Sequence, residues 1–325
     1  MFALRFDMRA PSTGAPAADL YAAALEMCAF AEQHGCARVL VCEHHGIDDG
    51  YLPSPMTLAT AIAARTTTLP IMIGVVLLPL YDPIRLAEDM AVLDLISKGR
   101  VSYIGGVGAR KVEFDMLGVD FHRRGKLADE KLDILLKAKT GRPFQVDGRT
   151  VQVTPAPFTP GGPMVMWGGG SPAAAKRAGR NGLMFFGQTD DPAIGEIYAE
   201  ARAQAGHDPG FCYLPARDAP TTTFVADDVD QAWEELGPYL MHDVLQYGQW
   251  YADNPDVSST SFATTAEELR AENATHRIFS IDDAVERVRG GDALALHPLI
   301  GGLPPDIAWK YLRIVTDRVL PAVKG

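Results

Sequence analysis

The chain has 325 residues, 47% of them hydrophobic and 22% charged, and a formal net charge of -11. This balance is typical of a folded globular protein and excludes a disordered chain. A net negative charge without a run of Lys or Arg also argues against binding to nucleic acid.

Segments that direct a chain to export or into a membrane are not predicted. Residues 1–7 alternate apolar and charged side chains and lack the apolar core of a signal peptide. The most apolar segment, residues 69–81, is shorter than the roughly 20 residues that span a bilayer. The four cysteines show no metal-ligand spacing. We therefore expect a cytoplasmic protein that binds no membrane.

Apolar runs that suit buried strands alternate with amphipathic segments that suit helices. Residues 17–34, for example, place Leu20, Ala24, Met27 and Ala31 on one helix face. Strands are predicted over residues 2–7, 39–42, 69–78, 100–104, 164–167, 183–186, 221–225 and 293–297. Helices are predicted over residues 17–34, 56–66, 83–97, 127–138 and 304–319. Three more are predicted: one that follows residue 172 and ends at about residue 178, one that begins at residue 192, and one that begins near residue 228. This alternation predicts an α/β fold, a (β/α)8 TIM barrel forming a single domain over residues 1–325.

Two segments interrupt the alternation. Residues of about 143–154 alternate with period two around Asp147-Gly148, which predicts an inserted β-hairpin. Residues of about 246–276 have no repeated pattern and mix aromatic with polar side chains. Because long loops of this kind are often functional, we interpret this insertion before the last strand as a candidate lid.

The triplet Glu43-His44-His45 follows the apolar run 39–42 directly. It therefore lies at the carboxyl end of a predicted strand, the edge where α/β barrels carry their active sites. The triplet suits a catalytic pair, a metal site or polar residues that cap the strand. A metal site is the weakest of these, because successive strand side chains face opposite ways and adjacent histidines converge poorly on one ion. We predict no metal ligand here.

A glycine-rich turn, Gly168-Gly169-Gly170-Ser171-Pro172, lies between a predicted strand and a predicted helix. The free backbone N–H groups and dipole of a helix amino terminus favour an anion there. A tight turn with Ser171 as the helix N-cap explains the same residues. Both interpretations stay open.

A second glycine-rich turn, Gly105-Gly106-Val107-Gly108-Ala109-Arg110, follows the fourth predicted strand. It lacks the third glycine of a Rossmann loop and the acidic residue that follows one. The turn suits a flat cofactor that lies against exposed backbone, with Arg110 as an anion partner. An exposed arginine in a glycine turn is the alternative.

Many ordered residues resemble the luciferase-like monooxygenase family, the flavin- and deazaflavin-dependent barrels related to bacterial luciferase. The most specific stretch runs from Leu78 to Asp89 and continues through residues 93–94 and 97–101. Further matches are Gly106-x-Gly108, Glu113-Phe114, Gly118-Val119-Asp120, Arg124, Asp129-Glu130, the Glu-His-His triplet, Gly168 to Ser171 and Val319-Leu320-Pro321.

The resemblance implies reduced FMN at the carboxyl mouth of the barrel. It places the phosphate near Gly169, Gly170 and Ser171, and His44 at the reactive edge, where a histidine holds or moves a proton. In this interpretation Glu43 orients the site and His45 is structural. The resemblance also implies a non-proline cis peptide at about Gly74-Val75. The residues expected to bind the cofactor are Gly74, Val75, Gly106, Gly108, Arg110, Gly169, Gly170 and Ser171.

One departure leaves the cofactor open. Bacterial luciferase has a phosphate-binding arginine at the position that is Val107 here, whereas this chain offers Arg110. Coenzyme F420, a deazaflavin, is therefore the alternative to reduced FMN.

The expected function is that of a two-component monooxygenase. Reduced FMN comes from a separate flavin reductase, reacts with O2, and one oxygen atom enters a small organic substrate. The alternative is hydride transfer by F420; remoter ones are a metal-dependent barrel hydrolase and a non-catalytic flavin-binding protein. A homodimer through the helix after Pro83 is expected. The residues expected to line the substrate pocket are Tyr51, Leu77, Trp167, Tyr247 and Trp250.

Overall fold

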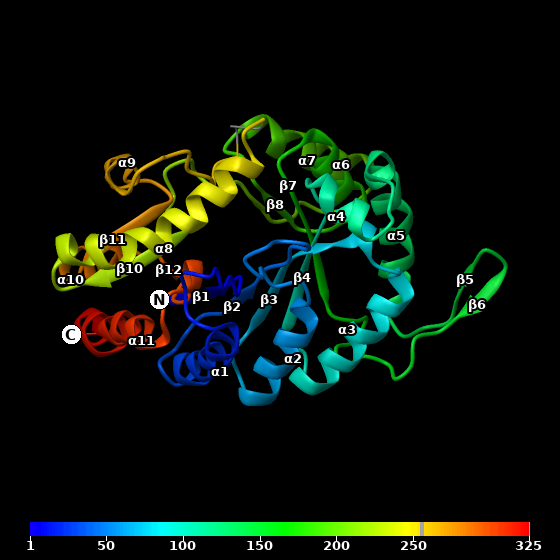
Figure 1. Ribbon diagram of the computed structural model, residues 1–325. Coiled ribbons are helices and arrows are strands. Elements are labelled where there is room, and N and C mark those ends of the chain that lie inside the picture. The colour runs from blue at the N-terminus through cyan, green and yellow to red at the C-terminus, as the bar shows by residue number, and fades with distance from the viewer. Residues whose placement is uncertain (254–256, 325) are drawn as a thin grey trace. The chain divides into compact units, whose positions relative to one another are not determined.

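The computed structural model describes residues 1–253 and 257–324 and has an α/β fold, as the sequence predicts (Figure 1). The chain divides into two compact units. The first comprises residues 1–40, 47–52 and 215–325, and the second residues 41–46 and 53–214. The prediction of one domain over residues 1–325 stays a prediction.

The first unit contains four parallel strands in the order β11-β10-β12-β1. These are β1 (Phe2–Phe6), β10 (Thr222–Ala226), β11 (His276–Ser280) and β12 (Leu294–Leu296). Its helices are α1 (Ala17–Gln33), α8 (Val229–Trp250), α9 (Ala266–Glu272), α10 (Ile281–Arg289), the short η3 (Ile300–Gly302), α11 (Pro305–Ile314), a π-helical turn (Val315–Val319) and α12 (Leu320–Lys324). The predicted apolar face of α1, which includes Leu20 and Met27, is buried.

The second unit contains five parallel strands in the order β3-β4-β7-β8-β9. They are β3 (Ile71–Leu77), β4 (Val101–Gly106), β7 (Met164–Gly169), β8 (Phe185–Gly187) and β9 (Cys212–Tyr213). Strand β2 (Val39–Val41) straddles the division between the units. The helices are α2 (Pro55–Arg65), η1 (Leu78–Leu80), α3 (Pro83–Ser97), α4 (Lys111–Met116), η2 (Phe121–Arg123), α5 (Arg124–Ala138), α6 (Pro172–Arg180) and α7 (Pro192–Gln204).

Helix α3 shows how local sequence sets an element's bounds. The Asp82 carboxylate accepts hydrogen bonds from the backbone N–H groups of Ile84 and Arg85, and Pro83 occupies the first turn. Lys98 ends the helix in the left-handed conformation, and Gly99 follows with φ +81°. Such caps satisfy backbone groups that a helix end leaves unpaired. The predicted range 83–97 is confirmed.

The inserted hairpin is also confirmed. Strands β5 (Phe144–Val146) and β6 (Arg149–Val151) pair antiparallel, and Figure 1 shows them extending away from α3 and α5. Asp147 and Gly148 both have positive φ, 47° and 73°. Two such residues form the tight turn whose twist matches that of the paired strands.

The prediction for residues 246–276 is wrong in part. Helix α8 continues to Trp250, α9 occupies residues 266–272, and β11 with α10 follows before the last strand. Strand β11 escaped prediction because its sequence, His-Arg-Ile-Phe-Ser, mixes charged and apolar residues without a run. Residues 254–256 lie outside the described residues, and the role of the segment as a lid stays a prediction. Within the described chain, no helix has both the length and the apolar character to cross a membrane.

Candidate active site

His44 forms a hydrogen-bonded pair with Glu113. The His44 Nδ1 atom lies 2.8 Å from Oε1 of Glu113, whose side chain is fully buried on α4. The same oxygen accepts the backbone N–H of His45 at 2.9 Å and lies 3.5 Å from Nη1 of Arg110. Because a carboxylate accepts hydrogen bonds, Nδ1 carries the proton and Nε2 is the nitrogen suited to exchange one. His44 keeps 16% of its side chain exposed.

The charge of Glu113 is set by its neighbours. Burial by itself raises the pKa of this carboxyl, but several interactions outweigh it and lower the pKa below its ordinary value. They are the hydrogen bond and charge of His44, the backbone N–H of His45 and the charge of Arg110. Glu113 is therefore a carboxylate at neutral pH, and it orients the His44 ring.

A second pair, formed by Glu43 and His45, lies directly beside the first in sequence. Glu43 is 1% exposed. Its Oε1 atom lies 2.8 Å from His45 Nε2 and accepts the Tyr81 hydroxyl at 2.9 Å, and its Oε2 atom accepts the Leu77 N–H at 3.2 Å. These contacts hold the segment after β2 against the end of β3. These contacts suit a positioning role for Glu43 and a structural role for His45, and both roles stay predictions.

The pKa values of this second pair are both raised. Burial raises the pKa of Glu43, and its hydrogen bonds only partly offset this. Burial would lower the pKa of His45, but the hydrogen bond and charge of Glu43, with the charge of Glu113, raise it further. The folded protein therefore holds protons at this pair more tightly than the unfolded chain does.

This proton binding predicts the pH dependence of stability. The ordinary pKa of histidine is 6.5, and folding raises that of His45. The stabilising contribution of His45 is thus fully present below pH 6.5 and is lost as pH rises through the folded pKa. We expect the free energy of unfolding of His45→Gln to fall less steeply above pH 6.5 than that of the wild type, measured by urea unfolding at a series of pH values. Equal slopes would contradict this.

The glycine turn after β4 makes room for neighbouring side chains. A Cβ atom on Gly106 would lie 3.2 Å from the Val75 side chain, and one on Gly108, where φ is +83°, would lie 3.1 Å from the Phe114 ring. Arg110 points back to the carbonyl oxygen of His45 at 3.4 Å as well as to Glu113. Packing thus contributes to the choice of glycine here, beside any cofactor.

The peptide bond between Gly74 and Val75 in β3 is cis. This confirms what the family resemblance implies for this position.

The turn after β7 caps helix α6, as one of its two interpretations predicts. Ser171 is the N-cap of α6, and its Oγ atom accepts the N–H of Ala174 at 3.3 Å. Gly170 and Ser171 are both exposed at this helix amino terminus. Gly169 has φ +149°, and a Cβ atom there would lie 2.7 Å from that of Ala174. The turn is therefore capped, and the binding of an anion by its exposed backbone stays a prediction.

Three of the five predicted pocket residues cluster in the first unit. The Tyr51 and Tyr247 hydroxyls lie 2.8 Å apart, and the Trp250 ring lies 5.1 Å from that of Tyr247 and 6.1 Å from that of Tyr51. The guanidinium of Arg9 lies over all three rings, at 4.6 to 5.2 Å from their centroids. Leu77 belongs to the second unit, where its N–H holds Glu43.

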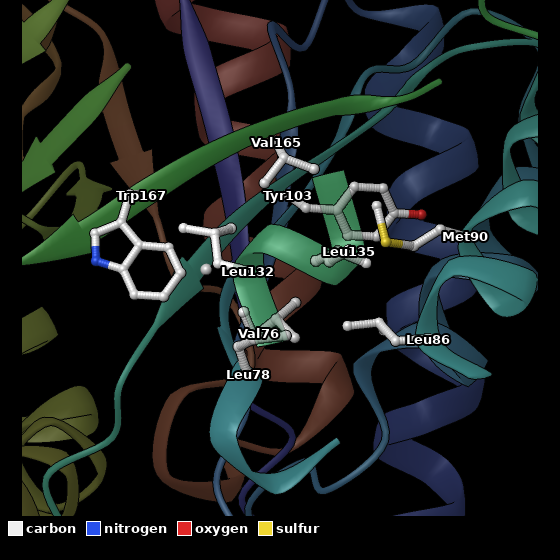
Figure 2. Close-up of a pocket in the computed structure, with 10 residues that line it drawn as sticks. Val76, Leu78, Leu86, Met90, Tyr103, Leu132, Leu135, Val165 and Trp167 are labelled. Carbon is white, nitrogen blue, oxygen red and sulfur yellow. The ribbon is translucent and has the colours of Figure 1, made fainter. Parts of the chain in front are cut away.

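Trp167, the fifth, occupies a core position. Its side chain is fully buried, between the strands β3, β4 and β7 and the helices α3 and α5 (Figure 2). The cavity beside it has a volume of about 10 Å³. That is room for about one water molecule, too little for an organic substrate. Trp167 therefore serves packing, and we leave it out of the proposed pocket. The cavity is lined by Val76, Leu78, Leu86, Met90, Tyr103, Gly105, Leu132, Leu135, Val165 and Trp167.

Replacing Trp167 tests this assignment. We expect Trp167→Ala to lower the free energy of unfolding by about 3–5 kcal/mol, because it removes the largest buried side chain of this layer and leaves a cavity. Urea unfolding followed by circular dichroism measures the change. A stable variant with a weakened substrate affinity would instead return Trp167 to the pocket.

Sequence reasoning missed the role of Glu113. Glu113-Phe114 matches the family pattern, but 69 positions separate Glu113 from His44, and no periodicity links them. The available signal was an acidic residue that follows the fourth strand and a histidine that follows the second, because all parallel strands of one sheet end at the same edge.

Three relatives share parts of this sequence. A protein of Sinorhizobium fredii without an assigned function is 33% identical over 131 residues, 40% of this chain and 37% of the relative. The 4-hydroxyprotoasukamycin monooxygenase of Streptomyces nodosus subsp. asukaensis is 26% identical over 82% of this chain and 75% of the relative. The oxygenase component of the flavin-dependent trigonelline monooxygenase of Acinetobacter baylyi is 23% identical over 80% of this chain and 74% of the relative. The chain thus spans between 37% and 75% of these relatives.

Solved structures share the fold over nearly the full length. The monooxygenase RslO1 of Streptomyces bottropensis has a TM-score of 0.76 at 21% identity, with 99% of both chains covered. The oxygenating constituent of 3,6-diketocamphane monooxygenase of Pseudomonas putida, in complex with FMN, has a TM-score of 0.71 at 20% identity, with 98% of both covered. The F420-dependent tetrahydromethanopterin reductase of Methanopyrus kandleri has a TM-score of 0.65 at 17% identity, also with 98% of both chains covered.

The decisive match is to a family rather than to one protein. Residues 2–296, most of the chain, match the model of the luciferase-like monooxygenases. The chain belongs to the luciferase-like monooxygenase family, a family of oxidoreductases.

Proposed function

We propose that this protein is the oxygenase of a two-component flavin-dependent monooxygenase, which uses reduced FMN and O2 to insert one oxygen atom into a small organic substrate. The observation that carries the proposal is the His44–Glu113 pair, a partly exposed imidazole held in one orientation by a buried carboxylate. The trigonelline monooxygenase relative, an oxygenase component, supports the two-component arrangement.

The residues that we propose to hold the cofactor fit its two ends. At the amino terminus of α6, the exposed backbone of Gly170 and Ser171 suits a phosphate, and Gly169 makes the turn possible. For the ring we propose the backbone at Gly74 and Val75 and the turn of Gly106 and Gly108. Arg110 is already engaged by Glu113, so we propose that it supports His44 rather than gripping the phosphate alone.

The protein's own chemistry in this proposal is proton handling and orientation. When bound, the reduced flavin supplies the electrons with which O2 reacts. His44 holds or moves a proton through Nε2, and Glu113 fixes the tautomer and stabilises the imidazolium. Glu43 keeps the segment after β2 in place through Tyr81 and Leu77. For water exclusion we propose Leu77, Tyr51, Tyr247 and Trp250, each within its own unit.

Hydride transfer by F420 is the second candidate. It is favoured by Val107, which stands where bacterial luciferase has its phosphate-binding arginine, and by the engagement of Arg110 with Glu113. A metal-dependent hydrolase is not favoured, because His44 and His45 bind different carboxylates. A non-catalytic flavin-binding protein would have no use for the oriented imidazole.

The remaining parts of the proposal concern partners and location. We propose a separate flavin reductase, a cytoplasmic location and a homodimer. Val92, Leu95 and Ile96 on α3 are 46%, 39% and 42% exposed, which supports a protein contact on that helix.

An anaerobic titration tests the choice of cofactor. We expect the purified protein to bind reduced FMN at least tenfold (~1.4 kcal/mol) more tightly than reduced F420. Product formation should then require O2. Turnover of a substrate with reduced F420 in the absence of O2 would establish the hydride-transfer alternative instead.

A further inference from the structure

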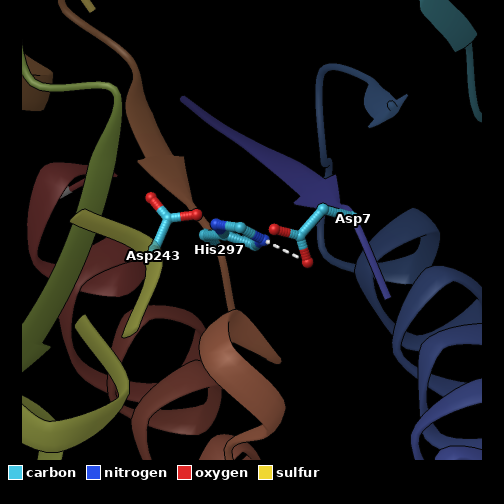
Figure 3. Close-up of side chains that lie close together, drawn as sticks. All are labelled: Asp7, Asp243 and His297. Carbon is cyan, nitrogen blue, oxygen red and sulfur yellow. Dashed lines mark ion pairs between the residues drawn. The ribbon is translucent and has the colours of Figure 1, made fainter. Parts of the chain in front are cut away.

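A histidine and two aspartates meet in the interior of the first unit, outside the site described above. Asp7 directly follows β1, His297 directly follows the neighbouring strand β12, and Asp243 lies on α8 (Figure 3). Their exposed fractions are 0%, 0% and 2%. One nitrogen or oxygen atom from each residue lies within 4.8 Å of those from the other two. Three elements thus converge on one buried point.

The outer oxygen atoms of both carboxylates are already bonded. Oδ2 of Asp7 accepts a hydrogen bond from Nε of Arg9 at 3.2 Å, and Oδ2 of Asp243 lies 3.2 Å from Nε2 of His276. Such contacts are typical of the residues that orient metal ligands from outside. The Oδ1 atom of Asp7 also accepts the backbone N–H of Arg9, at 3.2 Å.

Three polar atoms at the centre have no hydrogen bond within the described chain, although two of them form ion pairs. Within residues 1–253 and 257–324, neither ring nitrogen of His297 has a hydrogen bond, and neither has Oδ1 of Asp243. Nε2 of His297 lies 3.4 Å from Oδ1 of Asp7, and Nε of Arg9 lies 3.8 Å from Oδ1 of Asp243. Buried polar atoms are rarely left unpaired, because the lost hydration costs free energy.

The charges around the point leave room for a cation. The carboxylates are Asp7, Asp243 and Asp49, the last bonded to Arg9 at 2.6 Å and to His242 at 2.8 Å. The guanidinium groups are those of Arg9 and Arg5. Three carboxylates thus face two guanidinium groups around this point.

We propose that Asp7, Asp243 and His297 bind a divalent transition-metal ion that ties β1, β12 and α8 together. One imidazole and two carboxylates suit ions such as Mn²⁺, Fe²⁺ or Zn²⁺. Because the site is buried on all sides, its role is structural, and it is independent of the proposed flavin chemistry. The competing occupant is a proton, which makes His297 an imidazolium between the two carboxylates.

Metal binding separates the ion from the proton. The full chain, freed of any affinity tag, is stripped with a chelator, and Mn²⁺, Zn²⁺ or Co²⁺ is added back. We expect about one ion per chain by elemental analysis, a saturable rise in the melting temperature, and visible absorption from bound Co²⁺. No retained ion, no saturable rise and no Co²⁺ absorption would overturn the proposal and leave the proton.

Variants place the ion. Asp243→Asn and His297→Asn should weaken Co²⁺ binding by about 100-fold or more, since each removes a ligand. The control is His242→Gln, which alters the same charge network outside the three ligands and should keep one ion per chain. Equal Co²⁺ affinity in all three variants would place the ion elsewhere and contradict the assignment. If the ligand variants fail to fold, the absorption of Co²⁺ bound to the wild type still decides whether the chain binds a metal ion.

Discussion

Replacing His44 with Ala should lower turnover by about 10²–10⁴-fold while the affinity for reduced FMN changes little. The reason is that, in the proposed mechanism, Nε2 of His44 exchanges the proton while Nδ1 is held by Glu113. The proposed cofactor contacts lie mostly on glycine backbone and Ser171, which the substitution leaves intact. The measurement compares steady-state turnover with an accepted substrate against an anaerobic binding titration of reduced FMN.

Two further variants sharpen this test. His122→Ala removes an exposed histidine of the same unit and should turn over at the wild-type rate. Glu113→Gln keeps the shape of the side chain but removes its charge. We therefore expect a smaller loss of turnover than in His44→Ala, and a displaced pH profile of turnover. A His44→Ala variant with full turnover would support the non-catalytic flavin-binding alternative and remove His44 from the mechanism.

Replacing Glu43 with Ala should lower the free energy of unfolding by about 3–5 kcal/mol. Glu43 is buried, and its loss leaves His45, the Tyr81 hydroxyl and the Leu77 N–H without their acceptor. Unpaired buried donors lose hydration without compensation. Urea unfolding at pH 6 to 7 measures the change.

Two variants serve as controls for this prediction. One keeps part of the hydrogen bonding of Glu43, and the other removes a glutamate that is exposed. Glu43→Gln retains a carbonyl acceptor, so we expect its free energy of unfolding to fall clearly less than that of Glu43→Ala. Glu130→Ala removes a glutamate of α5 that is 49% exposed, and its effect should stay within about 0.5 kcal/mol. If Glu43→Ala were as stable as Glu130→Ala, the bonds of Glu43 would not hold this segment.

The fold was largely predictable because its signals are local. The apolar spacing in 17–34, the Asp82-Pro83 cap and the Asp147-Gly148 turn each depend on residues a few positions apart. Strand β11 was not predictable in this way, because its five residues lack an apolar run and gain their place by pairing with β10.

The site was predictable only in part because its geometry depends on distant residues and on the face of each strand. His44 and the turn at Gly169 follow from their places at strand ends. The Glu113 partner joins positions far apart in the chain. Trp167 was assigned to the pocket, but its side chain lies on the other face of the strand. Neighbouring residues of a strand point to opposite sides. Gly168 faces Val75, whereas Trp167 faces Gly105 and the helices.

The most direct test of the central claim is the oxygen dependence of turnover in the purified protein loaded with reduced FMN. With a panel of small organic substrates and ¹⁸O-labelled O2, we expect at least one product to carry one ¹⁸O atom in the wild type. No product should form without O2, and His44→Ala should form it about 10²–10⁴-fold more slowly. A product that forms under anaerobic conditions, or one that carries no label, would contradict the monooxygenase proposal.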